Sequence, residues 1–201
     1  MNRRFFALST GVFCALAASG LLAGCFDRKP SFTSIDVTGA DYAKDFSLPD
    51  QNGKVRTLKD FAGRIVVVFF GYTQCPDVCP TTMLELAEVK KALGKDGERV
   101  QGVFITIDPE RDTATVLKAY VGNFNPDFVA LRGTLEETQA TAKQFKVFYA
   151  KVPGKTPESY TMDHTAGSYV FDTTGQVRLF TRYGTGAEAL KHDLQLLLSQ
   201  G

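Results

Sequence analysis

The sequence predicts an α/β domain in which helices flank a central mixed sheet. Three observations support this fold class. Strand-like and helix-like segments alternate from Asp45 onward. Residues 65–70 form a continuous apolar run of strand length, typical of a central strand covered on both faces. Near the C-terminus, residues 168–172 and 176–181 flank the turn sequence Thr173-Thr174-Gly175, which predicts a hairpin.

The other elements follow in chain order. An extended segment at residues 46–49 and the turn signal Asn52-Gly53 precede the central strand. Strand patterns are then expected at residues 101–107, 128–131 and 147–152. Helical patterns lie at about residues 80–93, 113–124, 134–145 and 186–198. Alternation of this kind predicts a three-layer domain, parallel in its first half and closed by a hairpin and a C-terminal helix.

The N-terminus has the pattern of an exported and lipid-anchored protein. Two arginines precede an uncharged, mostly apolar run at residues 5–22; a run of roughly 18 residues is near the length of a membrane helix. The following Leu22-Ala23-Gly24-Cys25 resembles the bacterial lipoprotein signal. We therefore predict a signal peptide at residues 1–24, a lipidated Cys25 with a flexible tether at 25–40, and a domain at 41–201. An uncleaved anchor is the alternative.

Net charge and cysteine number exclude some classes of function. Removal of the two signal-peptide arginines lowers the formal net charge from +1 to −1, and nucleic-acid binding usually requires a basic excess. With Cys14 in the signal and Cys25 lipidated, two of the four cysteines remain. A disulfide between Cys75 and Cys79 would close a very short loop and stabilise the fold little, so we interpret the pair as functional.

Cys75 and Cys79 come directly after the central strand, where the next helix begins. Pro80 is comfortable only in the first turn of a helix, which places the regular start near residues 77–79. The helix macrodipole there favours the thiolate, the form that attacks disulfides and binds metals. A thiol pair at the first strand-to-helix junction makes the thioredoxin-like fold the natural choice, with the hairpin near the C-terminus as an insertion.

The spacing of the cysteines leaves two kinds of site open. Three residues separate them, one more than is usual in thioredoxin-like reductants. Two sulfurs at this spacing can close a disulfide or approach one metal ion. The motif alone therefore allows both a bare redox pair and a metal site.

The two histidines differ in position. His192 lies roughly 200° around its helix from Leu190, toward solvent, and is expected to be a surface residue. His164 lies in a polar segment, residues 160–165, which we predict as the loop entering the strand at 168–172. In a thioredoxin-like domain this loop lies beside the thiol pair. Two thiolates and an imidazole suit copper, with zinc as the main rival, and three protein ligands leave coordination open for transfer.

The chain is similar to the Sco/SenC family of copper-handling proteins. The matching segments are Asp45-Phe46-Ser47-Leu48, Gly71-Tyr72-Thr73-Gln74-Cys75-Pro76-Asp77-Val78-Cys79-Pro80, Ile107-Asp108-Pro109-Glu110-Arg111-Asp112 and Asp163-His164. The resemblance implies a thioredoxin-like fold, copper bound as Cu(I) or Cu(II) by Cys75, Cys79 and His164, and assistance in building the CuA centre of cytochrome c oxidase.

The resemblance also implies partners, a location and one supporting residue. The expected partners are the CuA-bearing oxidase subunit and a copper donor protein. The expected location is a lipid-anchored position on a membrane, facing the periplasm. For Asp108 the resemblance suggests a weak ligand or a hydrogen-bond acceptor near the metal, whereas the residues alone indicate only the end of a strand.

Three functions compete. The first is a copper metallochaperone, in which the redox state of Cys75 and Cys79 gates copper binding. The second is a thiol-disulfide oxidoreductase that reduces the CuA-site cysteines without carrying metal. The third is a peroxide-handling enzyme, since the Asp45 to Leu48 segment also occurs in thioredoxin-like peroxidases. No residue next to Cys75 or Cys79 in the sequence supplies the arginine of a peroxidase pocket, so the third function is the least expected and we expect the first.

Overall fold

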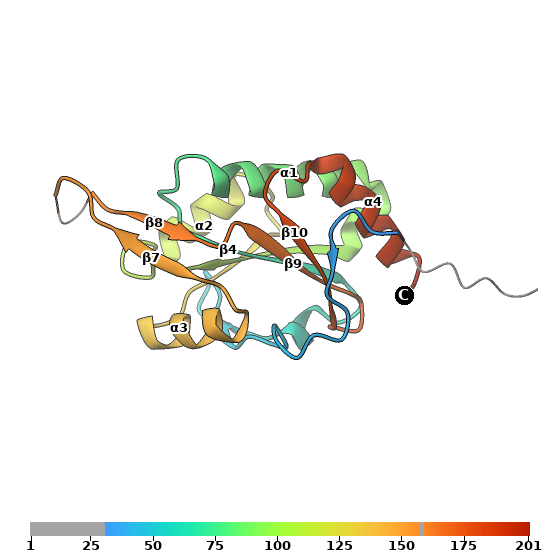
Figure 1. Cartoon of the computed structure of the whole chain (residues 1–201), viewed down its shortest axis with the longest axis horizontal. Coiled ribbons are helices and arrows are strands. Elements are labelled where there is room, and N and C mark those ends of the chain that lie inside the picture. The colour runs from blue at the N-terminus through green and yellow to red at the C-terminus, as the bar shows by residue number, and fades with distance from the viewer. Residues whose placement is uncertain (1–30, 157–158) are drawn as a thin grey trace, which may run out of the picture. The chain divides into compact units, whose positions relative to one another are not determined.

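The computed structural model describes residues 31–156 and 159–201. The predicted signal peptide, Cys25 and the first part of the predicted tether lie outside these residues. The described domain is built on a six-stranded central sheet (Figure 1). Its strands are β1 (Ile35–Asp36), β4 (Ile65–Gly71), β5 (Val100–Thr106), β6 (Val129–Leu131), β9 (Gly167–Phe171) and β10 (Val177–Arg182).

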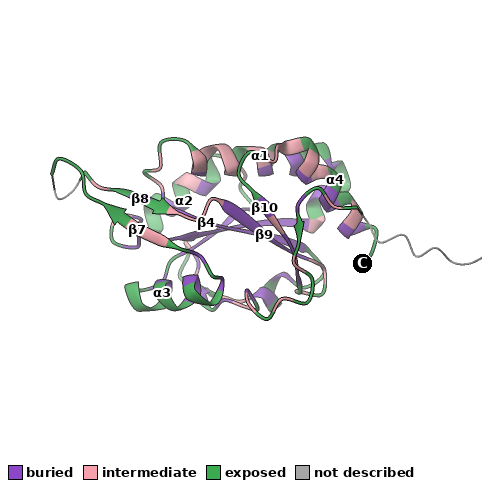
Figure 2. Ribbon diagram, in the orientation of Figure 1, coloured by how far each residue is buried: buried purple, intermediate pink, exposed green. Residues whose placement is uncertain are grey.

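The central sheet is mixed and has the order β1-β10-β9-β4-β5-β6. Strand β4 is parallel to β5, and β5 is parallel to β6. On the other side, β9 is antiparallel to β4 and β10 is antiparallel to β9. Every residue of β4 and β5 is buried (Figure 2), as expected for strands covered on both faces. The predicted central strand and C-terminal hairpin are confirmed, and the hairpin, β9–β10, belongs to this sheet.

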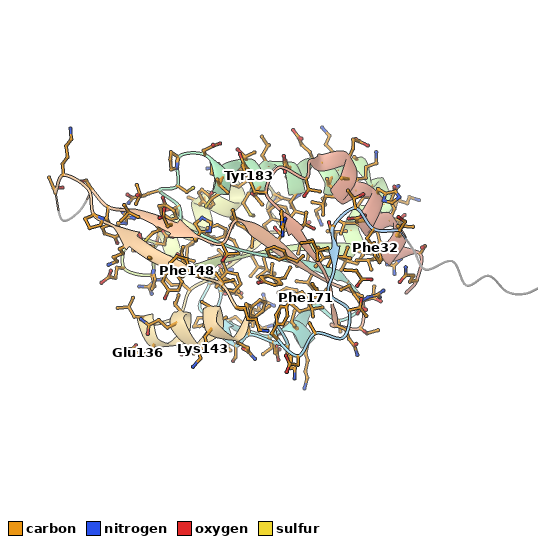
Figure 3. All side chains as sticks on the ribbon, viewed as in Figure 1. Phe32, Glu136, Lys143, Phe148, Phe171 and Tyr183 are labelled. Carbon is orange, nitrogen blue, oxygen red and sulfur yellow. The ribbon has the colours of Figure 1, made fainter. Side chains whose placement is uncertain are left out.

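Helices cover both faces of the sheet. Figure 1 shows α1 (Val78–Ala92) and α4 (Ala187–Leu198) on one face and α3 (Leu135–Gln144) on the other. The remaining helical segments are α2 (Ala114–Gly122), η1 (Leu58–Phe61) and η2 (Gly94–Arg99). On the α3 side of the sheet, Phe171 packs against Phe145 with ring centroids 6.1 Å apart. Phe148, near α3, and Tyr183, on the α1 side, are exposed (Figure 3). The four helices predicted from the sequence are confirmed.

Two short hairpins lie outside the central sheet. One pairs β2 (Leu48–Pro49) with β3 (Val55–Arg56), and the other pairs β7 (Tyr149–Val152) with β8 (Thr161–His164). Strand β8 corrects the prediction of a loop at residues 160–165. Three of its four residues are polar, and only Met162 is buried. The segment therefore has too little apolar patterning to be recognised as a strand.

The described part of the predicted tether is folded onto the domain. The amides of Thr33 and Ser34 both donate to the Asp193 carboxylate, at 2.8 Å, and β1 pairs with β10. Within the described residues the domain therefore begins before residue 41, which corrects the predicted end of the tether. None of the helices in residues 31–156 and 159–201 combines the length and hydropathy needed to cross a bilayer.

Candidate metal centre

The two cysteines lie where the sequence places them, at the start of α1. Cys79 is in the first turn and is fully buried, and Cys75 is partly buried in the preceding loop; both are free thiols. Gly71, the last residue of β4, makes room for the inner sulfur. A Cβ at this position would lie 2.8 Å from Cys79 Sγ, closer than real contacts allow. The end of the central strand is therefore shaped around the thiol.

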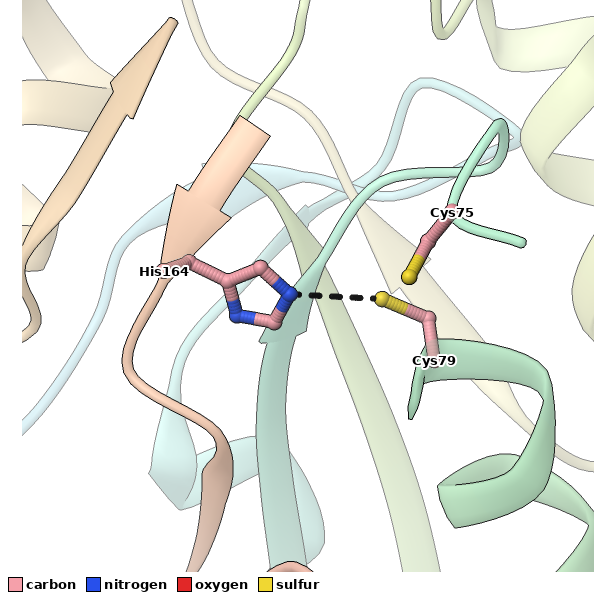
Figure 4. A group of neighbouring side chains, drawn as sticks. All are labelled: Cys75, Cys79 and His164. Carbon is pink, nitrogen blue, oxygen red and sulfur yellow. Dashed lines mark hydrogen bonds between the residues drawn. The ribbon is translucent and has the colours of Figure 1, made fainter. Parts of the chain in front are cut away.

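His164 completes a compact group of donor atoms. It is the last residue of β8, and its Nε2 lies 3.5 Å from Cys79 Sγ. One donor atom from each of Cys75, Cys79 and His164 lies within 4.8 Å of the others (Figure 4). Within the described residues no other group of histidine, cysteine or carboxylate donors has this arrangement. The structure thus brings together the three residues selected from the sequence.

The orientation of the imidazole is fixed from several sides. Nδ1 lies 3.1 Å from the Thr165 carbonyl. Because a carbonyl only accepts, Nδ1 donates the proton, and the lone pair of Nε2 faces the sulfurs. The rings of Phe69 and Tyr72 meet the imidazole edge-on, with centroids at 5.9 and 6.2 Å. The histidine is therefore held in the tautomer that can bind a metal.

The two thiols have opposite acidities. A hydrogen bond from Cys79 lowers the pKa of Cys75 to about 5, with further help from the backbone amides of Asp77 and Cys79. Donation of that hydrogen bond, together with burial, raises the pKa of Cys79. At neutral pH the reduced pair therefore holds one proton between two sulfurs, with Cys75 as the reactive thiolate.

Asp108 lies outside the three-residue group. It is buried, its Oδ2 accepts from Arg111 Nε at 2.5 Å, and its Oδ1 accepts from the Tyr160 hydroxyl at 2.8 Å. The carboxylate thus contacts residues that hold the segments bearing the donors. His192 is exposed and lies beside Asp193, as predicted for a surface histidine.

Sequence reasoning missed Asp112, whose carboxylate holds the loop between β4 and α1, residues 72–77 (the thiol loop). This buried carboxylate accepts from the Thr73 amide at 3.1 Å, the Thr73 hydroxyl at 2.6 Å and the Thr106 hydroxyl at 2.5 Å. Burial raises its pKa. Thr73 precedes Cys75 by two residues, so Asp112 ties the loop to the end of β5. In the sequence, Asp112 appears only as the last residue of the family-like segment 107–112, and no role was assigned to it.

A family model described as SCO1/SenC matches residues 36–199. The SCO2-like protein of Rickettsia felis is 40% identical over 133 residues, which cover 66% of this chain and 65% of that protein. The mitochondrial SCO2 homolog of Bos taurus is 37% identical over 147 residues, which cover 72% of this chain and 54% of that protein. The match therefore spans between about half and two thirds of these relatives.

Solved structures of similar proteins cover the described domain. Bradyrhizobium japonicum ScoI with copper bound is 40% identical, with a TM-score of 0.70, and the match covers 79% of this chain and 99% of that chain. Apo Sco1 of Thermus thermophilus is 35% identical, with a TM-score of 0.74 and coverage of 83% and 97%. Yeast Sco1 with copper bound is 29% identical, with a TM-score of 0.73 and coverage of 81% and 91%. The predicted thioredoxin-like fold is confirmed.

Proposed function

The chain belongs to the SCO1/SenC family, and from this membership we propose that it binds copper through Cys75, Cys79 and His164 and assists assembly of the CuA centre of cytochrome c oxidase. The observation that carries the proposal is the mutual approach of the three donor atoms within 4.8 Å. Two sulfurs and one imidazole nitrogen form a donor set that suits copper. Bound copper in the structures of B. japonicum and yeast relatives supports the same choice of metal.

The three residues have separate tasks in this function. Cys75 offers a thiolate at neutral pH, because its pKa is lowered to about 5. Cys79 loses its thiol proton when copper binds its sulfur. His164 offers Nε2 because Nδ1 donates to the Thr165 carbonyl. Three protein ligands leave room for a ligand from a donor or acceptor protein, which favours transfer over permanent storage.

The same thiols would make copper binding depend on redox state. Oxidation joins the two sulfurs in a disulfide, passes two electrons to an oxidant such as a partner disulfide and the Cys79 proton to one of the released partner sulfurs, and leaves no thiolate at the site. Only the reduced pair can then hold copper. The expected partners are the CuA-bearing oxidase subunit and a copper donor protein.

A second candidate function is thiol-disulfide exchange without metal, which the low pKa of Cys75 favours. The Cys75 thiolate would attack a disulfide of the CuA-bearing subunit and form a mixed disulfide, releasing one thiolate of the subunit. Cys79, after losing its proton, would attack the Cys75 sulfur and release the second. The subunit gains two electrons and this chain ends as the Cys75–Cys79 disulfide.

Substitution of His164 by alanine separates the two functions, with His192→Ala as the matched control. In the reduced full chain we expect His164→Ala to lower copper affinity by at least about 100-fold, since loss of an outer partner alone typically costs 10- to 100-fold. The thiols should still oxidise reversibly, and His192→Ala should bind copper like wild type. Wild-type affinity in His164→Ala would exclude the histidine from the site.

The visible spectrum gives an independent test. Copper(II) added to the reduced full chain should produce an intense sulfur-to-copper charge-transfer band if the thiolates bind the metal. An unchanged spectrum with rapid disulfide formation would instead favour the oxidoreductase.

We also propose that Cys25 is lipidated after removal of residues 1–24 and anchors the protein to a membrane facing the periplasm. The test is cell fractionation combined with mass spectrometry of the mature N-terminus. Cys25→Ser should abolish the lipid-sized mass increase and release the protein from the membrane fraction. A wild-type protein that retains residues 1–24 would favour an uncleaved anchor.

A further inference from the structure

The side chain of Arg111 bridges the two segments that carry the proposed copper ligands. Its side chain is mostly buried, with 15% exposed. Nη1 donates to the Gln74 side-chain oxygen at 3.1 Å and to the Tyr160 carbonyl at 2.9 Å. Gln74 directly precedes Cys75, and Tyr160 directly precedes β8, which ends at His164. Figure 4 shows the loop that carries Cys75 and the strand that ends at His164 on opposite sides of the donor atoms. The guanidinium of Arg111 connects these two segments.

The guanidinium is itself fixed in place. Nε donates to Asp108 Oδ2 at 2.5 Å, and the Tyr160 hydroxyl donates to the other oxygen of the same carboxylate at 2.8 Å. The Arg111 guanidinium also stacks on the Tyr160 ring, 3.5 Å from its centroid. Asp108, Arg111 and Tyr160 thus form a closed cycle of contacts in which Asp108 is buried and the other two residues are partly buried. A planar, forked and permanently charged guanidinium can make all of these contacts, whereas a lysine would reproduce only some of them.

The histidine strand depends on such contacts. The β7–β8 hairpin is a two-stranded sheet of its own, not hydrogen-bonded to the central sheet, and an isolated hairpin is marginally stable. The Lys151–Glu110 ion pair also ties the hairpin to the domain, but about half of each side chain is exposed, so its contribution is small. The Met162 amide adds a hydrogen bond to the Tyr72 hydroxyl. The contacts around Arg111 therefore act together with the ring contacts of Phe69 and Tyr72 to fix where His164 lies.

We propose that Arg111 is a positioning residue that, through Gln74 and Tyr160, sets the separation between His164 Nε2 and the thiol sulfurs. This inference rests on the proposed copper site. Because loss of a residue that orients a ligand typically lowers metal affinity 10- to 100-fold, Arg111→Ala should do the same. Arg111→Lys keeps the charge but not the fork, and should give an intermediate loss.

The first experiment measures copper affinity of the reduced full chain by competition with a chelator. Arg178→Ala is the matched control, because Arg178 also forms a largely buried ion pair, with Asp172 at 3.2 Å. Its affinity should stay within about threefold of wild type, in contrast to the 10- to 100-fold loss expected for Arg111→Ala. Equal affinities in the two variants would overturn the proposal.

A double-mutant cycle then separates positioning from general damage. In a His164→Ala background, Arg111→Ala should lower the remaining affinity less than about threefold, because there is no histidine left to position. A full 10- to 100-fold loss in that background would overturn the proposal. If Arg111→Ala does not fold, Arg111→Lys enters the same cycle with the same criteria.

A metal-free readout keeps this inference distinct from the proposed function. In the reduced protein without copper, Arg111→Ala should shift the imidazole NMR signals of His164 and accelerate amide hydrogen exchange in β8, whereas Arg178→Ala should change neither. Unchanged signals and exchange in Arg111→Ala would overturn the positioning role. A wild-type protein that fails to bind copper would refute the proposed function, while these metal-free measurements would still decide the role of Arg111.

Discussion

Gly71→Ala adds a single methyl group at the point where the central strand meets the buried thiol. The new Cβ would lie 2.8 Å from Cys79 Sγ, 2.8 Å from Phe69 Cε1 and 2.9 Å from Phe104 Cε2. Ordinary contacts begin at 3.4 Å, so the sulfur or the rings must retreat by about 0.6 Å. All three neighbours are buried, so other core side chains must adjust to any such movement.

The size of the effect follows from this displacement. Overpacking of a core by one methyl group costs about 1 to 3 kcal/mol of unfolding free energy. Metal–ligand distances in proteins stay within about 0.2 Å of their usual values, so a sulfur moved by several tenths of an ångström should also weaken the copper site. We expect copper affinity to fall about tenfold, together with the loss of stability.

Two measurements and two control variants test this reasoning. Urea unfolding of the reduced, metal-free protein gives the stability, and chelator competition gives the copper affinity. In Gly102→Ala the added Cβ would lie 2.7 Å from two atoms of the Phe128 ring, so stability should fall by about 1 to 3 kcal/mol at wild-type copper affinity. Gly122 has no atom within 4 Å of a built Cβ, and Gly122→Ala should be neutral or stabilising by up to about 1 kcal/mol.

The decisive comparison is between Gly71→Ala and Gly102→Ala. If both lose stability to the same extent and both bind copper like wild type, then Gly71 does not position the Cys79 sulfur. The argument that the strand end is shaped around the thiol would then be wrong.

Three further predictions concern protons. Alkylation of Cys75 in the reduced, metal-free protein should rise with pH around a midpoint of about 5 and outpace that of Cys79; a midpoint near the ordinary value of 9.0 would contradict the assignment. Copper(I) binding by the reduced pair at pH 7.5 should release about one thiol proton, from Cys79, measured with a pH indicator; release of two would mean that Cys75 is also protonated. Asp193→Ala should accelerate amide exchange at Thr33 and Ser34 by roughly 10- to 100-fold. Burial raises the pKa of Asp193, but the hydrogen bonds from Thr33, Ser34 and His192 together outweigh burial and lower the pKa below 3.8. The carboxylate therefore stabilises the contact above pH 3.8 and loses this effect as pH falls through the lowered pKa. Amide protection that persists in Asp193→Ala would contradict the role of the carboxylate.

The central part of the fold was predictable because its signals are local. Strand β4 is seven apolar or small residues in a row, and α3 begins with a capping box formed by Thr134 and Glu137. Strand β8 was not predictable in the same way. It has four residues, one of them buried, and it forms by pairing with β7 across the connection at residues 153–160. Such pairing leaves no apolar pattern within the strand itself.

The donor residues were predictable for a chemical reason. Few residue types bind soft metals, and the chain has only two histidines and four cysteines. The residues that orient the donors are common ones. Asp112 reaches Thr73 across 39 positions and Arg111 reaches Tyr160 across 49, and such contacts become visible only when the chain is folded.

The two halves of the site are held by different parts of the molecule, and this determines how substitutions should act. Cys79 is buried in the first turn of α1 and its sulfur lies against the end of β4. A change at Gly71 should therefore lower stability and copper affinity together. His164 lies on a hairpin outside the central sheet, where local opening costs less free energy than global unfolding. Arg111→Lys keeps a positive charge beside the buried Asp108 carboxylate and should therefore lower copper affinity with little effect on the urea midpoint. Opposite behaviour, with Arg111→Lys strongly destabilised and Gly71→Ala affected only in copper binding, would mean that the hairpin, not the core, limits the stability of the domain.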